Sequence, residues 1–422
     1  MRVSQRSRET DVISRASIRL ETAPGMESGR AVSPTTGDTR HAIDRLLAYC
    51  GRNQWAGFDP YDCLNSRLIQ QTPLRGSKWF RIVLTQVMKR LPVNLRPLFL
   101  VPPERNPKAI ALFLKSIGKL MTVGMVTGDG LAGEMMKYLV ELRAESSPYW
   151  CWGYCFPWQT RTELVPKGSP NLVCTCFVAD ALLDHYERTR DAAALEMALS
   201  AAEFLVNELY WSESGGEAGF SYPFPGARSR VHNANYLGAA LLCRSFKHTG
   251  EKKFLDPALA VARYSSSMQH GDGSWDYGES PTQRWVDNFH TGYNLCALRS
   301  IGEDVATDEF QETIRKGLAF YRDRFFMDDG APKYFHDRAY PIDIHSVAQS
   351  MITLLVFKND CPDGDAVAHA VHRWAMEHMW DERGYFYYQV RPYFTNRISY
   401  MRWSQAWMLL ALATLLESDL RG

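Results

Sequence analysis

The feature that most constrains the fold is a repeated unit of two helices and one long loop. In each unit, an apolar segment with helical periodicity precedes a more amphipathic helix and then a loop rich in glycine and aromatic residues. The repeat is visible in the histidines near the start of three apolar segments, because His290 follows His232 by 58 residues and His345 follows His290 by 55. This period is too long for a tetratricopeptide-type unit. It predicts an α/α hairpin whose inner helix is buried nearly all round and whose outer helix has one wet face.

The number of helices predicts how the hairpins are arranged. Apolar helices are predicted at 108–123, 174–188, 234–248, 289–302, 344–358 and 400–417, and their partners at 130–144, 192–210, 252–268, 307–324 and 364–380. The last apolar helix has no partner after it, and an amphipathic helix at 40–50 has none before it. Pairing these two helices would close the chain into a ring. We therefore predict an all-α fold, an (α/α)6 toroid with aromatic-rich loops on one face. An open solenoid is the alternative, since closure rests on the helix count.

Composition defines the expected domain boundaries. Residues 1–38 are rich in Arg, Ser and Thr and have no apolar periodicity, so we expect a disordered N-terminal extension. Residues 39–422 are expected to form a single toroid domain. An irregular insertion at about 66–107 should interrupt it, with one helix near 77–90 and a proline-rich link.

Charge and cysteine content argue against several classes of function. The net charge of +1 offers no electrostatic basis for binding nucleic acid or an anionic membrane, and no apolar run reaches the roughly 18 residues of a transmembrane helix. Nine cysteines without a secretory signal predict reduced thiols and a cytoplasmic protein. The spacing of Cys151, Cys155, Cys174 and Cys176 matches no common zinc motif, so we expect neither a metal nor another cofactor.

Aromatic residues indicate the class of ligand. Trp, Tyr and Phe make up 12% of the chain, and many lie in the loops beside Asn, Gln and Arg. A sugar ring stacks its C–H face on an aromatic ring while its hydroxyls form hydrogen bonds. The loops therefore favour a saccharide or polysaccharide substrate.

Candidate site residues lie where the inner helices begin, because the first turns of all six should meet at one central cavity. An Asp at a helix start is more often a cap, and a His in an apolar helix is more often a core residue. Three histidines, two aspartates and an arginine at equivalent points of separate repeats nevertheless favour a site. The catalytic candidates are His290, His345, Asp287, Asp343, Tyr340 and Arg402. The substrate-binding candidates are Trp152, Trp158, Arg161, His232, Asn233, Asn235, Trp275, Tyr277, Asn288, Tyr334, Gln349, Tyr400, Trp403 and Gln405.

Several segments resemble a known group of proteins. MRWSQAWMLLALATLLE (401–417) and FKHTGEKKFLDPALAVARY (246–264) are similar to repeats of the N-acylglucosamine 2-epimerase family, which belongs with six-hairpin glycosidases and toroidal polysaccharide lyases among the α/α-toroid carbohydrate-active enzymes. HNAN, DNFHTG, YPIDIHSVAQ and YMRWSQAW resemble toroid proteins associated with polysaccharide assembly. The resemblance covers about 110–420 and implies an enzyme of polysaccharide biosynthesis or modification. The full His and Glu pattern of the epimerases is not found, and the large β-domain of the lyases is absent.

The candidate residues allow three functions. Proton abstraction by an epimerase or a lyase needs a base, an acid and a cation. His290 and His345 fit the first two roles, with Tyr340 or Tyr400 as substitutes, and Arg402 fits the third. Glycoside hydrolysis needs two carboxyl groups about 5–5.5 or 6.5–9.5 Å apart, for which Asp287 and Asp343 are the candidates. A non-catalytic glycan-binding toroid is the third possibility. The number of His and Tyr residues favours proton abstraction.

Overall fold

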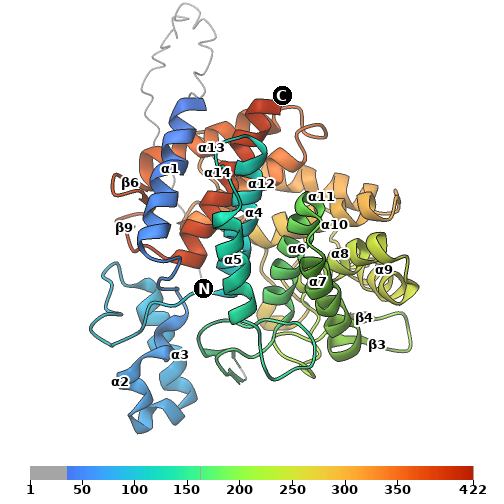
Figure 1. Ribbon diagram of the computed structural model, residues 1–422, viewed down its shortest axis with the longest axis horizontal. Helices are drawn as coiled ribbons and strands as arrows, with labels where there is room; N and C mark the ends of the chain where they lie inside the picture. Colours follow the sequence, from blue (N-terminus) through green and yellow to red (C-terminus); the bar gives the residue numbers. More distant parts are fainter. Residues whose placement is uncertain (1–35, 162, 422) are drawn as a thin grey trace, which may run out of the picture. The chain divides into compact units, whose positions relative to one another are not determined.

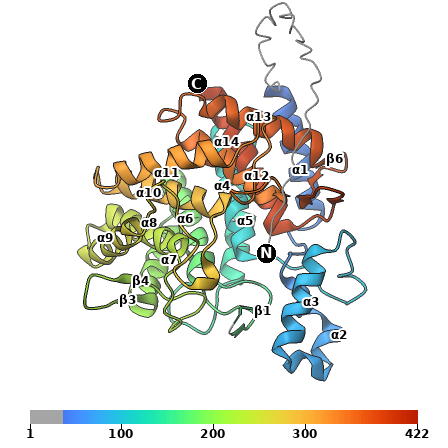
Figure 2. The same ribbon diagram turned by 180° about the vertical axis from the view of Figure 1, so that it is seen from behind.

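A closed ring of six inner helices forms the core of the protein. The computed structural model describes residues 36–161 and 163–421, and the structure reported below concerns these residues. Each inner helix packs against the next one along the chain, and the last packs against the first (Figures 1 and 2). The inner helices are α4 (Pro107–Thr122), α6 (Leu172–Thr189), α8 (His232–Thr249), α10 (Asn288–Asp304), α12 (Ile344–Val356) and α14 (Trp407–Arg421). The predicted toroid is thereby confirmed, and the open solenoid is wrong.

The outer helices complete the hairpins. Five of them pack against the inner helix that precedes them, and the first packs against α14, as the helix count predicted. They are α5 (Gly130–Glu141), α7 (Ala192–Phe204), α9 (Lys252–Ser267), α11 (Gln311–Arg324), α13 (Gly364–His378) and α1 (Thr36–Arg52). Because α1 begins at Thr36, three residues of the predicted disordered extension, 36–38, belong to this helix; residues 1–35 lie outside the described part.

Capping side chains fix where the inner helices begin. Asn106, Asn171, Asp287 and Asp343 each accept a hydrogen bond from a backbone N–H in the first turn of α4, α6, α10 and α12, respectively. These bonds satisfy N–H groups that have no partner within the helix. Two π-helical turns, η3 (Leu205–Leu209) and η5 (Met401–Ala406), lie at the end of α7 and at the start of α14.

The loops at the N-terminal ends of the inner helices form small antiparallel sheets. Three strands connect the loop before α12 with the loop before α14, where Asp343 lies opposite Gln389 and Gln389 lies opposite Asn396. The strands are β1 (Trp158–Gln159) with β2 (Leu164–Val165), β3 (Tyr210–Ser212) with β4 (Ala218–Phe220), β6 (Trp380–Asp381) with β7 (Tyr385–Phe386), and β5 (Ile342–Asp343) with β8 (Gln389–Val390) and β9 (Thr395–Asn396). A 3-10 turn, η4 (Pro281–Gln283), lies in the loop before α10.

Residues 63–103, which we call the insertion arm, project from the ring (Figures 1 and 2). The arm contains α2 (Arg67–Gln70), η2 (Pro73–Gly76) and α3 (Lys78–Arg90), and η1 (Asp62–Asn65) leads into it. A separate small cluster of Cys63, Leu64 and Met88 forms its core. The buried Arg96 attaches the arm to the ring, because its guanidinium donates to Asp62, to the Asp59 carbonyl and to the Tyr400 hydroxyl over 2.5 to 2.9 Å.

Within the described ranges, no helix is both long and apolar enough to cross a bilayer.

Candidate functional site

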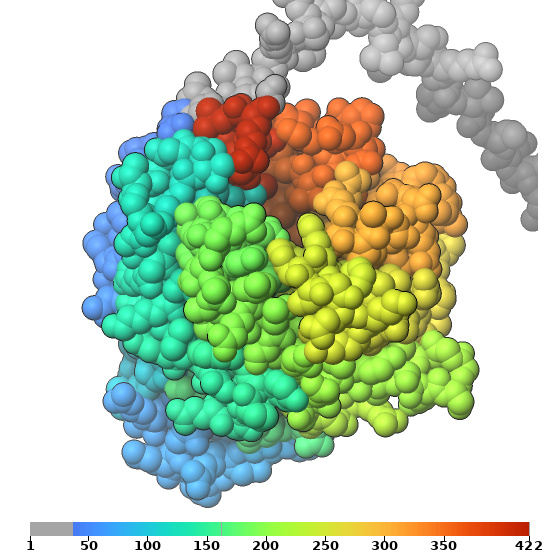
Figure 3. Space-filling view, turned by 45° about the vertical axis from the view of Figure 1, so that its right-hand side comes forward, coloured from blue at the N-terminus to red at the C-terminus, as the bar shows by residue number. Residues whose placement is uncertain are grey.

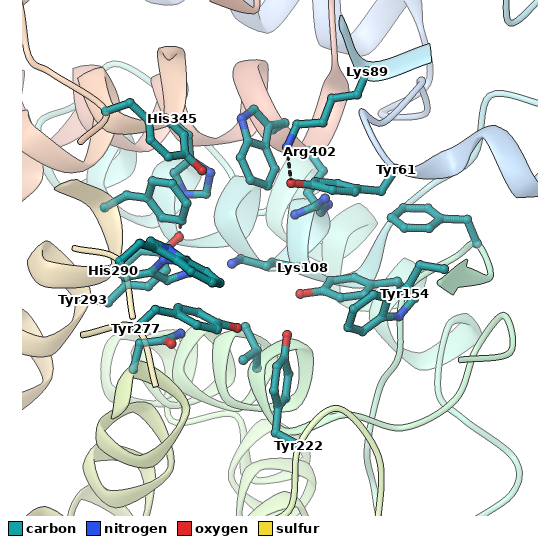
Figure 4. Close-up of a pocket in the computed structure, with 18 of the residues that line it drawn as sticks. Tyr61, Lys89, Lys108, Tyr154, Tyr222, Tyr277, His290, Tyr293, His345 and Arg402 are labelled. Atoms are coloured by element: carbon teal, nitrogen blue, oxygen red, sulfur yellow. Dashed lines mark hydrogen bonds between the residues drawn. The ribbon is translucent and has the colours of Figure 1, made fainter. Parts of the chain in front are cut away.

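A cavity of about 400 Å³ lies where the inner helices begin (Figure 4). Its walls are formed by Tyr61, Lys89, Lys108, Tyr154, Phe156, Trp158, Val173, Tyr222, Asn233, Tyr277, Trp285, Phe289, His290, Tyr293, Tyr334, Phe335, His345, Arg402 and Trp403. Aromatic and cationic side chains dominate this set. Neither Asp nor Glu occurs among the described residues that line the cavity.

His290 has a free ring nitrogen because a carboxylate holds the other one. Asp287, the N-cap of α10, accepts the backbone N–H of His290 at 3.0 Å and lies 2.7 Å from its Nδ1. The indole N–H of Trp285 donates to the same carboxylate at 2.9 Å. A carboxylate at Nδ1 holds the proton on that nitrogen, so the lone pair lies on Nε2. His290 therefore has the arrangement of a general base.

Tyr293 and His345 form a second pair on the same side of the cavity. The Tyr293 hydroxyl lies 2.5 Å from Nε2 of His345. Burial lowers the pKa of His345 well below its ordinary value, and the charges of Lys108 and Arg402 act in the same direction. Burial raises the pKa of Tyr293 well above its ordinary value. Tyr293 is therefore a protonated phenol beside a neutral imidazole, and its hydroxyl can give its proton to a strongly basic group such as a leaving alkoxide.

Lys108 lies on the floor of the cavity and has no carboxylate partner within the described residues. It follows Pro107 in the first turn of α4, and its amine lies 3.9 Å from the ring centre of Phe177, 5.3 Å from that of Tyr293 and 5.2 Å from that of Trp407. Burial lowers its pKa well below the ordinary value, and the charge of Arg402 contributes. The amine can therefore gain a proton when an anion enters, and the three aromatic faces stabilise the resulting cation.

Two further cations border the cavity. Arg402, in η5, donates two hydrogen bonds to the buried Asp59, at 2.6 and 2.8 Å, which fixes the plane of its guanidinium. Lys89 reaches in from α3, and its amine donates to the Tyr61 hydroxyl (Figure 4). The cavity thus has positively charged groups on more than one side.

Tyrosine hydroxyls face the centre of the cavity. Those of Tyr154, Tyr222 and Tyr277 point toward the same region as the Lys108 amine (Figure 4). Burial raises the pKa of Tyr222 to about 12 and that of the other two phenols well above the ordinary value, so all three remain hydrogen-bond donors. The ring of Tyr277 stacks on Trp285 with centroids 4.6 Å apart. These groups provide the stacking faces and donors that a sugar requires.

An aromatic layer separates this cavity from a second one at the opposite end of the ring. Phe177, Tyr293 and Trp407 contact one another with centroids 5.4 to 5.6 Å apart. Beyond them, residues from all six inner helices surround a hollow of about 520 Å³ (Figure 3). The site cavity is therefore closed at its floor.

Comparisons with known proteins identify the fold. No protein-family model matches the sequence, and no curated protein matches it significantly. Solved structures do match. A cellobiose 2-epimerase from Bacillus thermoamylovorans has a TM-score of 0.61 at 11% identity over 92% of this chain and 99% of that chain. An unsaturated glucuronyl hydrolase from Streptococcus agalactiae has a TM-score of 0.58 at 11% identity over 92% of this chain and 93% of that chain. An α-mannanase from Bacteroides thetaiotaomicron has a TM-score of 0.57 at 12% identity over 75% of this chain and 86% of that chain. The chain has the α/α-toroid fold of these enzymes.

The toroid brings eight of the predicted residues together around the cavity. They are His290, His345, Arg402, Trp158, Asn233, Tyr277, Tyr334 and Trp403. Most come from the first turns of inner helices or from the loops before them, as the repeat predicted. Asn233 Oδ1 is buried without a hydrogen-bond partner among the described residues, so it can accept a bond from a ligand.

The other predicted binding residues lie outside the cavity. Most are buried and hold the loops to the helices. Asn235 and Trp275 both donate hydrogen bonds to Ser265, and the Gln405 side chain accepts from the Phe386 backbone N–H and donates to the Phe386 carbonyl. Arg161 lines a separate surface groove. Trp152, His232, Asn288, Gln349 and Tyr400 are likewise buried away from the cavity walls.

The predicted catalytic roles of three residues need correction. Tyr340 is exposed and does not line the cavity. Asp343 is buried and accepts hydrogen bonds from the His345 backbone, the Trp403 indole and Gln389, so its carboxylate is occupied. Asp287 is occupied in the same way by His290 and Trp285. Both aspartates position neighbouring side chains, and neither faces the cavity as a hydrolytic carboxyl group would.

Several residues of the cavity wall were not predicted from the sequence, and Lys108 is the most informative of them. A lone lysine directly after Pro107 in an otherwise apolar helix start was the available signal. Tyr293 was visible in the first turns of α10 and Tyr61 in the aromatic loop at 53–62, whereas Lys89 comes from the insertion arm, which lies outside the repeat. The four cysteines whose spacing matched no common zinc motif are free thiols; they are Cys151, Cys155, Cys174 and Cys176. In the described residues, no three His, Cys, Asp or Glu side chains form a group that could hold a metal ion.

Proposed function

We propose that this toroid is an enzyme that removes a proton from an anionic saccharide, at the carbon next to the carboxylate of a uronic acid residue. One observation carries the proposal: the cavity combines a carboxylate-backed histidine with the basic side chains of Lys89, Lys108 and Arg402 and has no lining carboxylate in the described chain. Cations attract a negatively charged sugar, and a lining Asp or Glu would repel it.

The geometry supports a defined role for each group. Nε2 of His290 takes the proton, and the electron pair moves into the substrate carboxylate. Lys108 and Arg402 stabilise the charge that develops there. In an epimerase, a proton then returns to the opposite face of the carbon from a phenol across the cavity from His290, such as Tyr154 (Figure 4). In a lyase, the electron pair instead expels the oxygen at the neighbouring carbon, and Tyr293 protonates that leaving oxygen. Both reactions share the first step, which is the step proposed here.

Glycoside hydrolysis fits the cavity less well. It requires one carboxyl group as an acid and a second as a base or nucleophile. Asp287 and Asp343 were the predicted pair, but both are bound to neighbouring groups beside the cavity. Among the similar folds, the names of the 2-epimerases and of the glucuronyl hydrolase support a saccharide substrate. An enzyme of polysaccharide biosynthesis or modification remains our expectation.

Binding measurements test the charge of the substrate directly. Isothermal titration calorimetry should compare a uronate-containing disaccharide with the same disaccharide after reduction of its carboxylate to an alcohol. The acid should bind and the alcohol should bind at least about tenfold more weakly, since one charge-assisted hydrogen bond contributes about 1.5–3 kcal/mol. Equal affinities would overturn the proposal.

A further inference from the structure

The insertion arm carries an unusual share of exposed apolar surface. Half of the exposed large hydrophobic side chains in the described chain lie between residues 68 and 100. On α3, Trp79, Val83 and Val87 are 74, 56 and 47% exposed, respectively. Their spacing of four residues places them on one face of the helix, and Thr85 and Met88 on the other face are buried. This face has no partner within the toroid.

The arm is also strongly basic. Residues 63–103 contain seven Arg and Lys residues and no Asp or Glu. Of these, Arg67, Arg75, Lys78 and Arg90 are exposed, and none of the four forms an ion pair with another described residue. The net charge of +1 therefore conceals a local excess of positive charge on the arm, and a surface of one sign favours an acidic partner.

A neighbouring hairpin extends this surface. The tip between β8 and β9 carries Tyr393, which is 97% exposed, and Phe394. The hairpin contacts the arm, because the Asn396 side chain donates to the Leu91 carbonyl at 3.0 Å. Aromatic and aliphatic groups beside unpaired basic groups are the composition of segments that lie in the interface of a bilayer.

We propose that the insertion arm docks the toroid on the surface of an anionic lipid bilayer. Trp79, Val83 and Val87 enter the interface between headgroups and acyl chains, and the exposed Arg and Lys side chains bind the lipid phosphates. The same arm of a second copy is a poor partner, since a contact between two arms would place positive charge against positive charge. Nucleic acid would match the charge but leave the aliphatic stripe in water.

Docking through the arm has a consequence for the cavity. Lys89 lies at the C-terminal end of α3 and lines the cavity, whereas Trp79 lies at the other end of the same helix. The two are therefore separated by about 15 Å along the axis of α3. If the cavity acts on a saccharide as proposed above, its substrate can be one held at a membrane surface.

Vesicle flotation with the full chain tests the docking. Vesicles of phosphatidylglycerol and phosphatidylcholine should carry the protein upward, and vesicles of phosphatidylcholine alone should not. Added salt should weaken the binding, because the charges are exposed. Trp79→Ser with Val83→Ser, and separately Arg75→Glu with Lys78→Glu, should each weaken binding at least about tenfold. Val140→Ser on α5 is the matched control, since Val140 is as exposed as Val87, at 47%, and lies outside the arm.

Two results would overturn the proposal. One is an absence of binding to the anionic vesicles, or equal binding by the wild type and both double variants. The other has two parts: light scattering shows that the wild type is a dimer which Trp79→Ser with Val83→Ser converts to a monomer, and the wild type does not bind vesicles. Thermal unfolding followed by circular dichroism should be the same in all variants, which excludes misfolding as the cause of lost binding. Because saccharide turnover is not measured, failure here leaves the proposed function standing.

Discussion

At the scale of single residues, the site depends on pairs in which one side chain sets the state of another. Asp287 sets the tautomer of His290, and His345 accepts the hydrogen bond that orients Tyr293. The positions of His290, His345 and Arg402 at the cavity were predictable, because helix periodicity brings the first turns of the inner helices together. The sequence could not predict which side chains would be available to a ligand and which would already be hydrogen-bonded to a neighbour. This depends on contacts between side chains that lie far apart in the chain, such as Trp403 and Asp343, which are 60 residues apart.

His290 and Asp287 should be required together. His290→Ala should lower turnover by about 10²–10⁴, the usual contribution of a positioned base. Asp287→Asn should cause a similar loss, because a neutral amide with one oxygen cannot replace both carboxylate oxygens that bond to His290 and Trp285, and it no longer stabilises the imidazolium formed when Nε2 takes a proton. Asp191→Asn is a matched control, since Asp191 also caps a helix, α7, but is exposed on the outer layer. Steady-state kinetics on a uronate-containing oligosaccharide measure these effects, and full activity of Asp287→Asn would contradict the role of the pair.

Lys108 should take up a proton when the anionic substrate binds. Burial lowers the pKa of Lys108, and a bound carboxylate raises that pKa again, so binding should draw a proton onto the amine. Calorimetry in two buffers with different ionisation enthalpies should therefore give different apparent binding enthalpies for the wild type. Lys108→Met keeps the apolar stem and should remove the difference. A wild-type enthalpy that is the same in both buffers would show that Lys108 does not change its charge.

Asp343 should make stability depend on pH. Burial raises its pKa to about 6, so the folded protein holds this proton more tightly than the unfolded chain does. The resulting stabilisation is present below about pH 4 and is lost as the pH rises to about 6, a change of roughly 3 kcal/mol at most. Asp343→Asn keeps the cap and should show a weaker pH dependence between these values. Urea unfolding at several pH values measures it, and identical pH profiles would contradict the explanation.

At the scale of helices and loops, the apolar period predicted most elements because the inner helices are buried nearly all round. All six were predicted within a few residues, except that the last begins with a π-helical turn rather than an α-helix. The outer helix α11 begins at Gln311, four residues later than predicted, since a turn through Phe310 precedes it. The part of the wall contributed by Lys89 was missed, because the insertion arm has no counterpart in the repeat.

The α1 helix should stabilise the ring strongly. Leu46 on α1 is fully buried, and α1 packs against α14. Leu46→Ala should lower the free energy of unfolding by about 2–5 kcal/mol, through lost burial and the cavity that remains. The same substitution at Leu420, which is exposed on α14, should change it by less than about 0.5 kcal/mol. Equal effects in urea unfolding would mean that α1 is not part of the core.

At the scale of the whole toroid, ring closure creates the site. The starts of the inner helices surround one cavity only because α14 packs against α4. The helix count predicted this closure, whereas the depth of the cavity and its lack of a lining carboxylate in the described chain depend on side-chain packing. The fold leaves the reaction open, because similar toroids carry the names of epimerases, a glucuronyl hydrolase and a mannanase. The charge of the cavity is what favours proton abstraction from an acid sugar.

The most direct test of proton abstraction is a reaction with uronate-containing oligosaccharides in deuterium oxide, followed by nuclear magnetic resonance and ultraviolet absorbance. The wild type should place deuterium on the carbon next to the carboxylate or form the absorbing double bond of an unsaturated uronate. His290→Ala should do neither. Cleavage of the oligosaccharide by the wild type with no deuterium at that carbon and no double bond would contradict proton abstraction and show hydrolysis instead.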